Sequence, residues 1–123
     1  MNTKPLNSNT VRSAVLAQSA GAAPMARAHI LCGHQHWFVV AVDCENSDVF
    51  YGWVFGIGED REGWFRFSEL AQSVRPLRVV QYAESGLKVL NAPRIVEQAL
   101  GFEPLALDTT KARMRTLGPV VQR

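Results

Sequence analysis

Residues 37–70 read WFVVAVDCENSDVFYGWVFGIGEDREGWFRFSEL, and this stretch decides the fold. It holds all three tryptophans and five of the six phenylalanines of the chain. Runs of aromatic and β-branched residues alternate here with polar or glycine-bounded segments, which is typical of antiparallel strands joined by short loops. The pattern predicts strands at Trp37–Asp43, Val49–Ile57 and Trp64–Phe67.

The second of these strands has two unlike faces, because side chains alternate between the faces of a strand. One face carries Tyr51 and Trp53, and the other carries Gly52 and Gly56 among apolar residues. Since two positions of the glycine-bearing face lack bulk, we expect a neighbouring element to approach closely there. The segment Gly58–Gly63 is charged and bounded by glycines, so it is predicted to be the hairpin loop.

The third strand runs directly into a predicted helix. Trp64 and Arg66 share one face of the strand, while Phe65 and Phe67 share the other, which we expect to point to the core. Ser68–Val74 then starts the helix, with its first residue as the N-cap, and it must end before the next proline.

Further elements are predicted on both sides of this stretch. His29–Cys32 is a short lead-in strand, and Leu77–Tyr82 is a fourth strand that pairs at the edge of the sheet. Asn91–Leu100 has a cap residue, a proline in its first turn and an apolar stripe, so it is predicted to be a helix that Gly101 ends. Asp108–Leu117 repeats this pattern before a Gly-Pro pair.

These elements predict an α+β fold, in which a small antiparallel meander of three to four strands packs against helices on one face. Residues 29–123 are expected to form this single domain with its C-terminal helices. Residues 1–28 are rich in Asn, Ser, Thr, Ala and Gly. They are expected to form a flexible or loosely docked arm that contains two turns of helix from about Thr10.

The composition is that of one ordinary globular domain, because 47% of the 123 residues are hydrophobic and 20% are charged. No apolar run approaches the roughly 20 residues of a membrane helix, and no secretion signal is visible, so we expect a cytoplasmic protein. Two cysteines are too few for a disulfide framework, and in a reducing compartment we expect Cys32 and Cys44 to be thiols. The oligomeric state is left open.

Charge is distributed unevenly along the chain. Residues 1–42 hold three bases and no acid, residues 43–107 hold ten acids and six bases, and residues 108–123 hold four bases and one acid. This is not the concentrated basic face that nucleic-acid binding favours. Lys111, Arg113 and Arg115 are nevertheless candidates for contact with nucleic acid, and the alternative is a solvated helix face that obeys the helix-dipole preference.

Four potential metal ligands lie around the first long strand, namely Cys32, His34, His36 and Cys44. Thiolate and imidazole together suit zinc, but the spacing gives neither a Cys-x-x-Cys nor a His-x-x-x-His pair. On a strand the first three would share one face, about 7 Å apart at successive positions. We predict no metal and no cofactor, and whether these residues ever bind a metal is left open.

The acidic segment Glu59–Glu62, with Glu69 one strand away, is the candidate for paired-carboxylate chemistry. A charged hairpin tip is more often solvated surface, and the sequence offers no nucleophile–base pair beside it. The glycines between residues 52 and 63 match neither the dinucleotide-binding nor the Walker pattern. The sequence therefore predicts a protein that is not an enzyme.

Aromatic and charged residues of the second and third strands form the remaining candidate site. Aromatic rings interleaved with arginine can anchor a protein partner, stack unpaired bases or pack under the C-terminal helices. We predict a surface that binds a protein partner. Its predicted residues are Tyr51, Trp53, Glu62, Trp64, Arg66 and Glu69.

A longer pattern resembles a family of small bacterial proteins of unknown function that are carried on plasmids and on conjugative or integrative elements. It consists of Trp37-Phe38, Asp43, Asp48, Tyr51-Gly52 and the run Gly63–Leu70. The family pattern is an aromatic strand, an acidic loop, an aromatic-glycine strand, a glutamate, Gly-Tyr-Phe-x-Leu, and a Glu-Leu pair that opens a helix. Glu62, Trp64-Phe65 and Glu69-Leu70 stand at matching positions, and the similarity covers about residues 37–82. After the helix the family tends to an acidic pair, where this chain has other residues.

The resemblance implies a mobile-element setting and a small α+β fold, and it implies no activity, substrate or catalytic residue. Together with the aromatic face it predicts a non-enzymatic protein-interaction module that serves a mobile element by modulating host defence or transfer. The alternative is a nucleic-acid-binding protein that uses the aromatic residues of the sheet and the basic ends.

Overall fold

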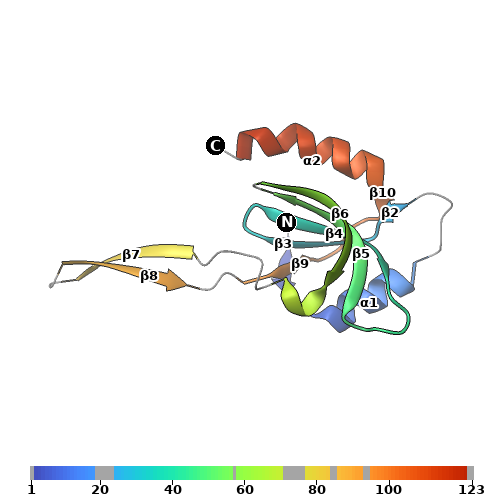
Figure 1. Cartoon of the computed structure of the whole chain (residues 1–123), viewed down its shortest axis with the longest axis horizontal. Helices are drawn as coiled ribbons and strands as arrows, with labels where there is room; N and C mark the ends of the chain where they lie inside the picture. Colours follow the sequence, from blue (N-terminus) through green and yellow to red (C-terminus); the bar gives the residue numbers. More distant parts are fainter. Residues whose placement is uncertain are drawn as a thin grey trace.

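The computed structural model of the chain describes residues 2–18, 24–56, 58–70, 77–83, 86–92 and 95–121 (Figure 1). In 77–83, 88–92 and 118–121 it describes the backbone only. The class is α+β, as predicted, but the sheet has six strands rather than three or four. Its spatial order is β1 (Thr3–Pro5), β9 (Glu97–Ala99), β3 (Ala28–Cys32), β4 (Gln35–Val42), β5 (Val49–Gly56) and β6 (Glu59–Arg66).

The centre of the sheet is the predicted antiparallel meander, in which β3 pairs with β4, β4 with β5, and β5 with β6. The third strand is longer than predicted. It begins at Glu59, which pairs with Gly56, so the connection is a tight turn at Gly58, whose φ is 75°. The acidic segment predicted to be a hairpin loop is therefore strand, and its side chains alternate between the two faces of the sheet.

Helices cover both faces of the sheet, so the prediction of helices on one face only is wrong (Figure 1). The reason lies in β5, whose Phe50 and Val54 point to one side while Trp53 points to the other, and all three are buried. A strand that is apolar on both faces needs cover on both. The cover is α1 (Ser8–Leu16) on one side and α2 (Leu107–Val121) on the other.

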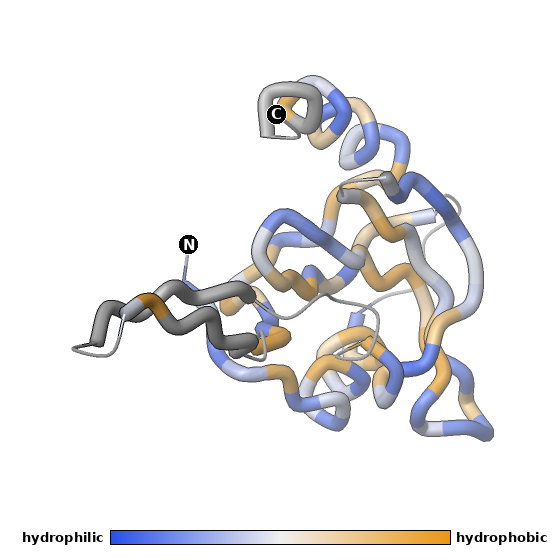
Figure 2. Tube along the Cα trace, turned by 60° about the vertical axis from the view of Figure 1, so that its left-hand side comes forward, coloured by the Kyte–Doolittle hydropathy of each residue, from blue (hydrophilic) through white to orange (hydrophobic). Residues whose placement is uncertain are grey.

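Each face has its own core, and in Figure 2 the central strands carry much of the hydrophobic colour. The α1-side core contains Val11, Val15, Ala28, Ile30, Cys32, Trp37, Val39, Phe50, Val54, Phe67, Leu70 and Val96. The α2-side core is smaller and contains Ala26, Phe38, Trp53, Phe55 and Leu107.

Residues of the expected N-terminal arm contribute to both cores. Asn7 caps α1 by accepting a hydrogen bond from the Thr10 N–H at 3.1 Å, and the helix buries Val11 and Val15. Ahead of it β1 forms one edge of the sheet, and after it β2 (Met25–Ala26) pairs with β10 (Leu105–Ala106). Burial of apolar residues at helical spacing is what a short helix needs to be stable in a domain.

The predicted close approach at the glycine-bearing face of β5 is present. A Cβ at Gly52 would overlap the carbonyl oxygen of Phe38 and lie 3.3 Å from the Val39 Cα. The register of β4 shifts between Val39 and Ala41, which bends β4 at the position where it faces Gly52. The faces of β6 are also as predicted, because Phe67 is buried and Phe65 packs against the α1-side core.

The helix predicted after β6 is described only as the 3-10 turn η1 (Phe67–Glu69), and residues 71–76 lie outside the described residues. Its cap differs from the prediction. The Ser68 N–H donates to Asp48 at 2.9 Å and the Ser68 hydroxyl donates to the same carboxylate at 2.5 Å. Asp48, from the β4–β5 loop, thus satisfies the N-terminus of η1, and Ser68 is a donor there.

Two predictions for the following segment need correction. Leu77–Ala83 is a strand, β7, but it pairs with β8 (Gly86–Ala92) in a sheet of its own and not at the edge of the main sheet (Figure 1). The helix predicted at Asn91–Leu100 is wrong, because β8 ends at Ala92 and β9 follows. In β9 and the residue before it, Val96 and Gln98 are buried with period two, as a strand requires.

The last helix, α2, begins at Leu107, so Asp108, which was predicted to be its cap, lies in its first turn. The helix continues to Val121 through the Gly-Pro pair that was predicted to end it. Within the part of the chain that the structure describes, no helix has the length and apolar character to cross a membrane.

Candidate functional site

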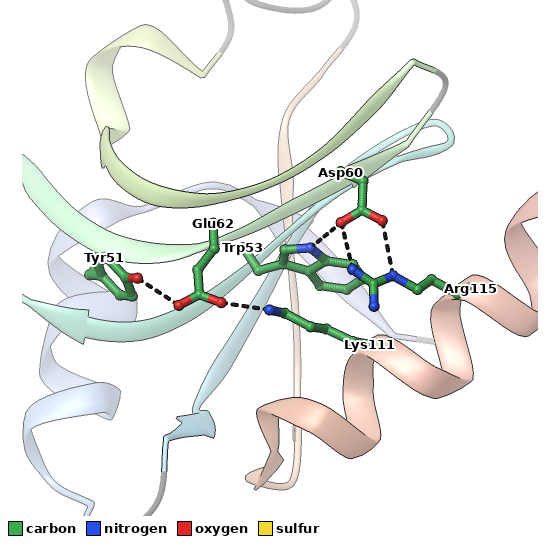
Figure 3. Close-up of polar contacts among 6 residues, drawn as sticks. All are labelled: Tyr51, Trp53, Asp60, Glu62, Lys111 and Arg115. Atoms are coloured by element: carbon green, nitrogen blue, oxygen red, sulfur yellow. Dashed lines mark hydrogen bonds and ion pairs between the residues drawn. The ribbon is translucent and has the colours of Figure 1, made fainter.

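The candidate site lies where α2 crosses β5 and β6, and Trp53 is at its centre (Figure 3). The indole of Trp53 is 1% exposed, and its N–H donates to Asp60 Oδ1 at 2.8 Å. Asp60 comes from β6, next to the residue that pairs with Val54 of β5. A buried indole N–H needs a partner, and this carboxylate provides one.

Asp60 also receives Arg115 from α2. Arg115 Nε lies 2.9 Å from one carboxylate oxygen, and Nη2 lies 3.0 Å from the other. The Arg115 hydrogen bond, followed by that of Trp53, holds the pKa of Asp60 below its ordinary value, and the same contact raises the pKa of Arg115. This two-point fork fixes the geometry of α2 over the sheet.

Glu62, two residues after Asp60 on β6, is also bound by an aromatic residue of β5 and a basic residue of α2. The Tyr51 hydroxyl donates to one oxygen of Glu62 at 2.6 Å, and Lys111 Nζ donates to the other at 2.6 Å. The Lys111 bond and then the Tyr51 bond lower the pKa of Glu62, whereas the pKa of Tyr51 is raised by its bond to this carboxylate. We call these two linked groups, Tyr51–Glu62–Lys111 and Trp53–Asp60–Arg115, the α2 clamp.

The clamp uses charges that were predicted to contact nucleic acid. Lys111 and Arg115 are ion-paired to β6, and their cationic groups also lie 5.9 Å and 5.7 Å from the centre of the Trp53 ring. Arg113 is exposed on α2. The structure therefore brings two of the three basic residues into an intramolecular contact.

The six predicted partner-binding residues fall into two groups. Tyr51, Trp53 and Glu62 belong to the α2 clamp. The other three, Trp64, Arg66 and Glu69, are exposed and line a groove at the β6 edge. Trp64 is 60% exposed and meets the Tyr51 ring edge-on at 5.2 Å.

The groove beside β6 has a cavity volume of about 180 Å³. Apolar residues of the α1-side core reach it, and charged residues form its rim. The guanidinium of Arg61 lies over the Phe65 ring at 4.8 Å, which holds this rim residue against the strand. The lining residues are Gln35, Trp37, Val54, Glu59, Arg61, Trp64, Phe65, Arg66, Glu69 and Leu70.

The main chain of β6 adds a second feature to this groove, because the order of the main sheet ends at β6. The Phe67 N–H donates to the Asp48 carbonyl across the β5–β6 ladder at 2.8 Å. Since hydrogen-bonded and non-hydrogen-bonded pairs alternate in an antiparallel ladder, Trp64 and Arg66 turn their main-chain N–H and C=O groups away from β5. Among the described strands none but β5 pairs with β6, so this side of β6 can accept a further strand.

The predicted metal-ligand cluster is divided by the fold. Gly33 has a φ of 61°, and the turn that it forms with His34 reverses the chain between β3 and β4. Cys32 therefore enters the α1-side core, whereas His36 lies on the α2 side, so the expectation of one shared face is wrong. Within the described segments, no three His, Cys, Asp or Glu side chains are placed to hold a metal.

His36 instead contacts His29, which sequence reasoning did not select. Their Nδ1 and Nε2 atoms are 2.8 Å apart, and the His29 ring stacks on Phe38 at 4.4 Å. Burial, and then the charge of His36, lower the pKa of His29 to about 4, and burial also lowers that of His36. Both imidazoles are therefore neutral near pH 7 and pack as part of the domain.

Asp60 was predicted only as part of the acidic segment Glu59–Glu62, and its contact with α2 was not predicted. A signal was present, because Asp60 and Glu62 are two apart and Lys111 and Arg115 are four apart. The first spacing places both acids on one face of a strand, and the second places both bases on one face of a helix. Two such pairs of opposite charge can dock an amphipathic helix on a sheet.

Comparison of the chain with protein-family models, with curated proteins and with solved structures found no match. The resemblance over residues 37–82 therefore rests on the sequence pattern alone.

Proposed function

We propose that this protein is a non-enzymatic protein-interaction module whose binding surface is the outer edge of β6 and the groove beside it. The observation that carries the proposal is Trp64, a tryptophan 60% exposed on the last strand of the main sheet. Tryptophan and arginine are enriched among the residues that contribute most to binding at protein interfaces, and Arg66 stands two positions away on the same face.

The mode of binding that fits this surface is strand addition, in which an extended segment of the partner pairs with a sheet edge. Main-chain hydrogen bonds would come from the outward groups of Trp64 and Arg66, and an apolar side chain of the partner would enter the groove. The charges of Glu59–Glu62 limit this mode to the second half of β6, because charged residues are a common protection of sheet edges.

A mobile-element accessory role is part of the same proposal, and the resemblance over residues 37–82 is what supports it. In such a role the partner is a protein of the host or of the element, and binding modulates defence or transfer. The α2 clamp makes nucleic acid the less favoured partner, because Lys111 and Arg115 already neutralise Glu62 and Asp60.

The test is affinity purification from a bacterial lysate with three forms of the chain: wild type, Trp64→Ala and Leu16→Ala. Leu16 is a matched control, because it is also 60% exposed but lies on α1. We expect a specific protein to be retained by the wild type and by Leu16→Ala and to be lost with Trp64→Ala.

Two outcomes would contradict the proposal. One is a partner that Trp64→Ala retains as well as the wild type does. The other is the absence of any specific protein together with tight nucleic-acid binding that weakens steeply with salt, which is the behaviour of phosphate contacts.

A further inference from the structure

The charges along β6 are divided between its two halves. The first half, Glu59–Glu62, holds three acids and one base, whereas the second half, Gly63–Arg66, holds one base and no acid. The base of the first half is Arg61, whose Nε lies 3.9 Å from a carboxylate oxygen of Glu59 and whose guanidinium reaches over the Phe65 ring of the second half at 4.8 Å. An antiparallel copy of this strand would therefore set acid against base, and a parallel copy would set like charges together.

The outer main chain of β6 can form such a pair. Glu62, Trp64 and Arg66 turn their N–H and C=O groups away from β5, because they belong to the non-hydrogen-bonded pairs of the β5–β6 ladder. Among the described strands none but β5 pairs with β6. If two copies pair with Trp64 opposite Trp64, these three residues lie opposite one another, and about six main-chain hydrogen bonds form between the copies.

The side chains match in the same register. With Trp64 at the two-fold axis, Glu62 lies opposite Arg66 of the second copy on both sides of the axis. Opposite residues of an antiparallel pair share a face, so two ion pairs flank an aromatic pair on the α2 side of the sheet. On the other side Phe65 lies opposite Gly63, which has no side chain to obstruct the ring. A slip of two residues in either direction separates Glu62 from Arg66 and Trp64 from its counterpart.

The side chains that this register brings together are open to a second copy. Trp64 is 60% exposed, and the side chains of Arg66 and Glu62 are 51% and 33% exposed. Among the described residues the ion partner of Arg66 is Asp48, at 3.9 Å, so its guanidinium can donate to a closer carboxylate. Glu62 accepts two hydrogen bonds within the α2 clamp, but a carboxylate can accept about four, so it can also accept from Arg66 of the second copy.

We propose that two copies of the chain associate through the outer edges of their β6 strands, antiparallel and with Trp64 opposite Trp64. Such an interface is isologous, as in most homodimers. The proposal rests on the β6 surface of the proposed function and adds its regulation, because the second copy covers the edge that a segment of another protein would use. That protein must then displace the second copy, and the dimer protects an open sheet edge from unspecific pairing.

The test is sedimentation velocity of the full chain at concentrations up to about 1 mM. We expect the wild type to form a dimer of twice the 13.6 kDa chain mass. Arg66→Glu should weaken the dimer by about tenfold to a hundredfold, because by symmetry it makes two attractive cross-strand charge pairs repulsive. The control is Lys4→Glu, the same reversal of charge on β1 at the other edge of the sheet, which should leave the dimer unchanged. A monomeric wild type, or equal dimerisation of the two variants, would overturn the proposal.

Cysteine cross-linking tests the register, with Cys44→Ser as the background because Cys44 is exposed. The two thiols introduced by Trp64→Cys would have Cα atoms about 5.5 Å apart, a distance that a disulfide spans, so oxidised glutathione should join them in a covalent dimer. The two thiols introduced by Arg66→Cys would be displaced by four residues, roughly 13 Å, and should stay unlinked. Equal cross-linking of the two variants would refute the register.

Self-association and the proposed function can fail separately. A monomeric chain that retains a lysate protein through Trp64 contradicts the dimer and supports the proposed function. A dimer that retains no lysate protein and binds nucleic acid tightly supports self-association and contradicts the proposed function.

Discussion

Gly52 and Gly63 form a cross-strand pair, and replacing each by alanine tests the packing of the sheet. The same chemical change is made at two positions that face each other, yet their surroundings differ. A Cβ at Gly52 would overlap the Phe38 carbonyl oxygen and lie 3.1 Å from the carbon of that carbonyl. A Cβ at Gly63 would meet only the end of the Arg61 side chain, at 3.9 Å.

The expected magnitudes follow from these contacts. At Gly63 the new methyl group fits, so the loss of chain entropy in the unfolded state should raise the free energy of unfolding by about 0.4–1 kcal/mol. At Gly52 the obstacle is backbone, which cannot turn aside as a flexible side chain can. Overpacking of this kind costs about 1–3 kcal/mol, so Gly52→Ala should be less stable than Gly63→Ala by about 1.4–4 kcal/mol.

Urea unfolding followed by tryptophan fluorescence measures the difference, because Trp37 and Trp53 are buried at 2% and 1% exposure. Both variants should keep the same dependence of the free energy of unfolding on urea, since the surface exposed on unfolding is nearly unchanged. Equal stability of Gly52→Ala and Gly63→Ala would refute the close approach of β4 to β5 at this point.

Three further predictions concern charge and the hairpin. Burial depresses the pKa of His29 from 6.5 to about 4, so stability on the order of 3 kcal/mol is present above pH 6.5 and is lost as the pH falls toward 4. In urea unfolding at a series of pH values, His29→Phe should reduce the dependence of the free energy of unfolding on pH between 6.5 and 4. The same pH dependence in the variant and the wild type would argue against a buried neutral imidazole. The side chains of Asp60 and Arg115 are 40% and 52% exposed. A double-mutant cycle with Asp60→Asn and Arg115→Gln should therefore give a coupling free energy of only about 0.2–1 kcal/mol, which decreases at high salt. A coupling free energy well above this range and independent of salt would contradict the exposed geometry. Leu77 pairs with Ala92 at the base of the β7–β8 hairpin. Replacing the segment Leu77–Ala92 by a short Gly-Ser linker should leave the remaining domain folded, as judged by circular dichroism and cooperative unfolding. An unfolded product would show that the hairpin belongs to the core.

The meander was predictable because its signals are local. Runs of aromatic and β-branched residues between short polar or glycine-bounded segments indicate the strands, and the alternation of side chains along a strand assigns their faces. Gly52 at the centre of β5 indicated a close neighbour correctly. The strand β6 was predicted too short because charged residues at Glu59–Glu62 are also typical of a loop. Pairing with β5 across a tight turn, and docking of α2, which is distant along the chain, make this segment a strand.

The segment before Gly101 was predicted wrongly because its local pattern fits both a helix and a strand. Apolar residues at Ile95, Val96, Ala99 and Leu100 fit helical spacing, and an Asn-Ala-Pro entry and a closing glycine occur at the ends of strands as well as of helices. In the structure Ile95 is 66% exposed and Leu100 is 46% exposed, so half of the apparent stripe faces water. This segment is a strand and not a helix because β9 pairs with β1 on one side and with β3 on the other.

The α2 clamp decides which surface of this domain is left for a partner. The sequence predicts one candidate sheet face that includes Trp53 and Trp64, and a separate basic segment at Lys111–Arg115. In the structure α2 covers Trp53, and its bases are paired with Asp60 and Glu62, so the aromatic face is divided along β6. Nucleic-acid stacking on Trp53 would require α2 to leave the sheet. Leu107 would then be exposed, with no other apolar side chain buried in its place. Binding at Trp64 requires no such change, and for that reason the edge of β6 is the surface on which the proposed function rests.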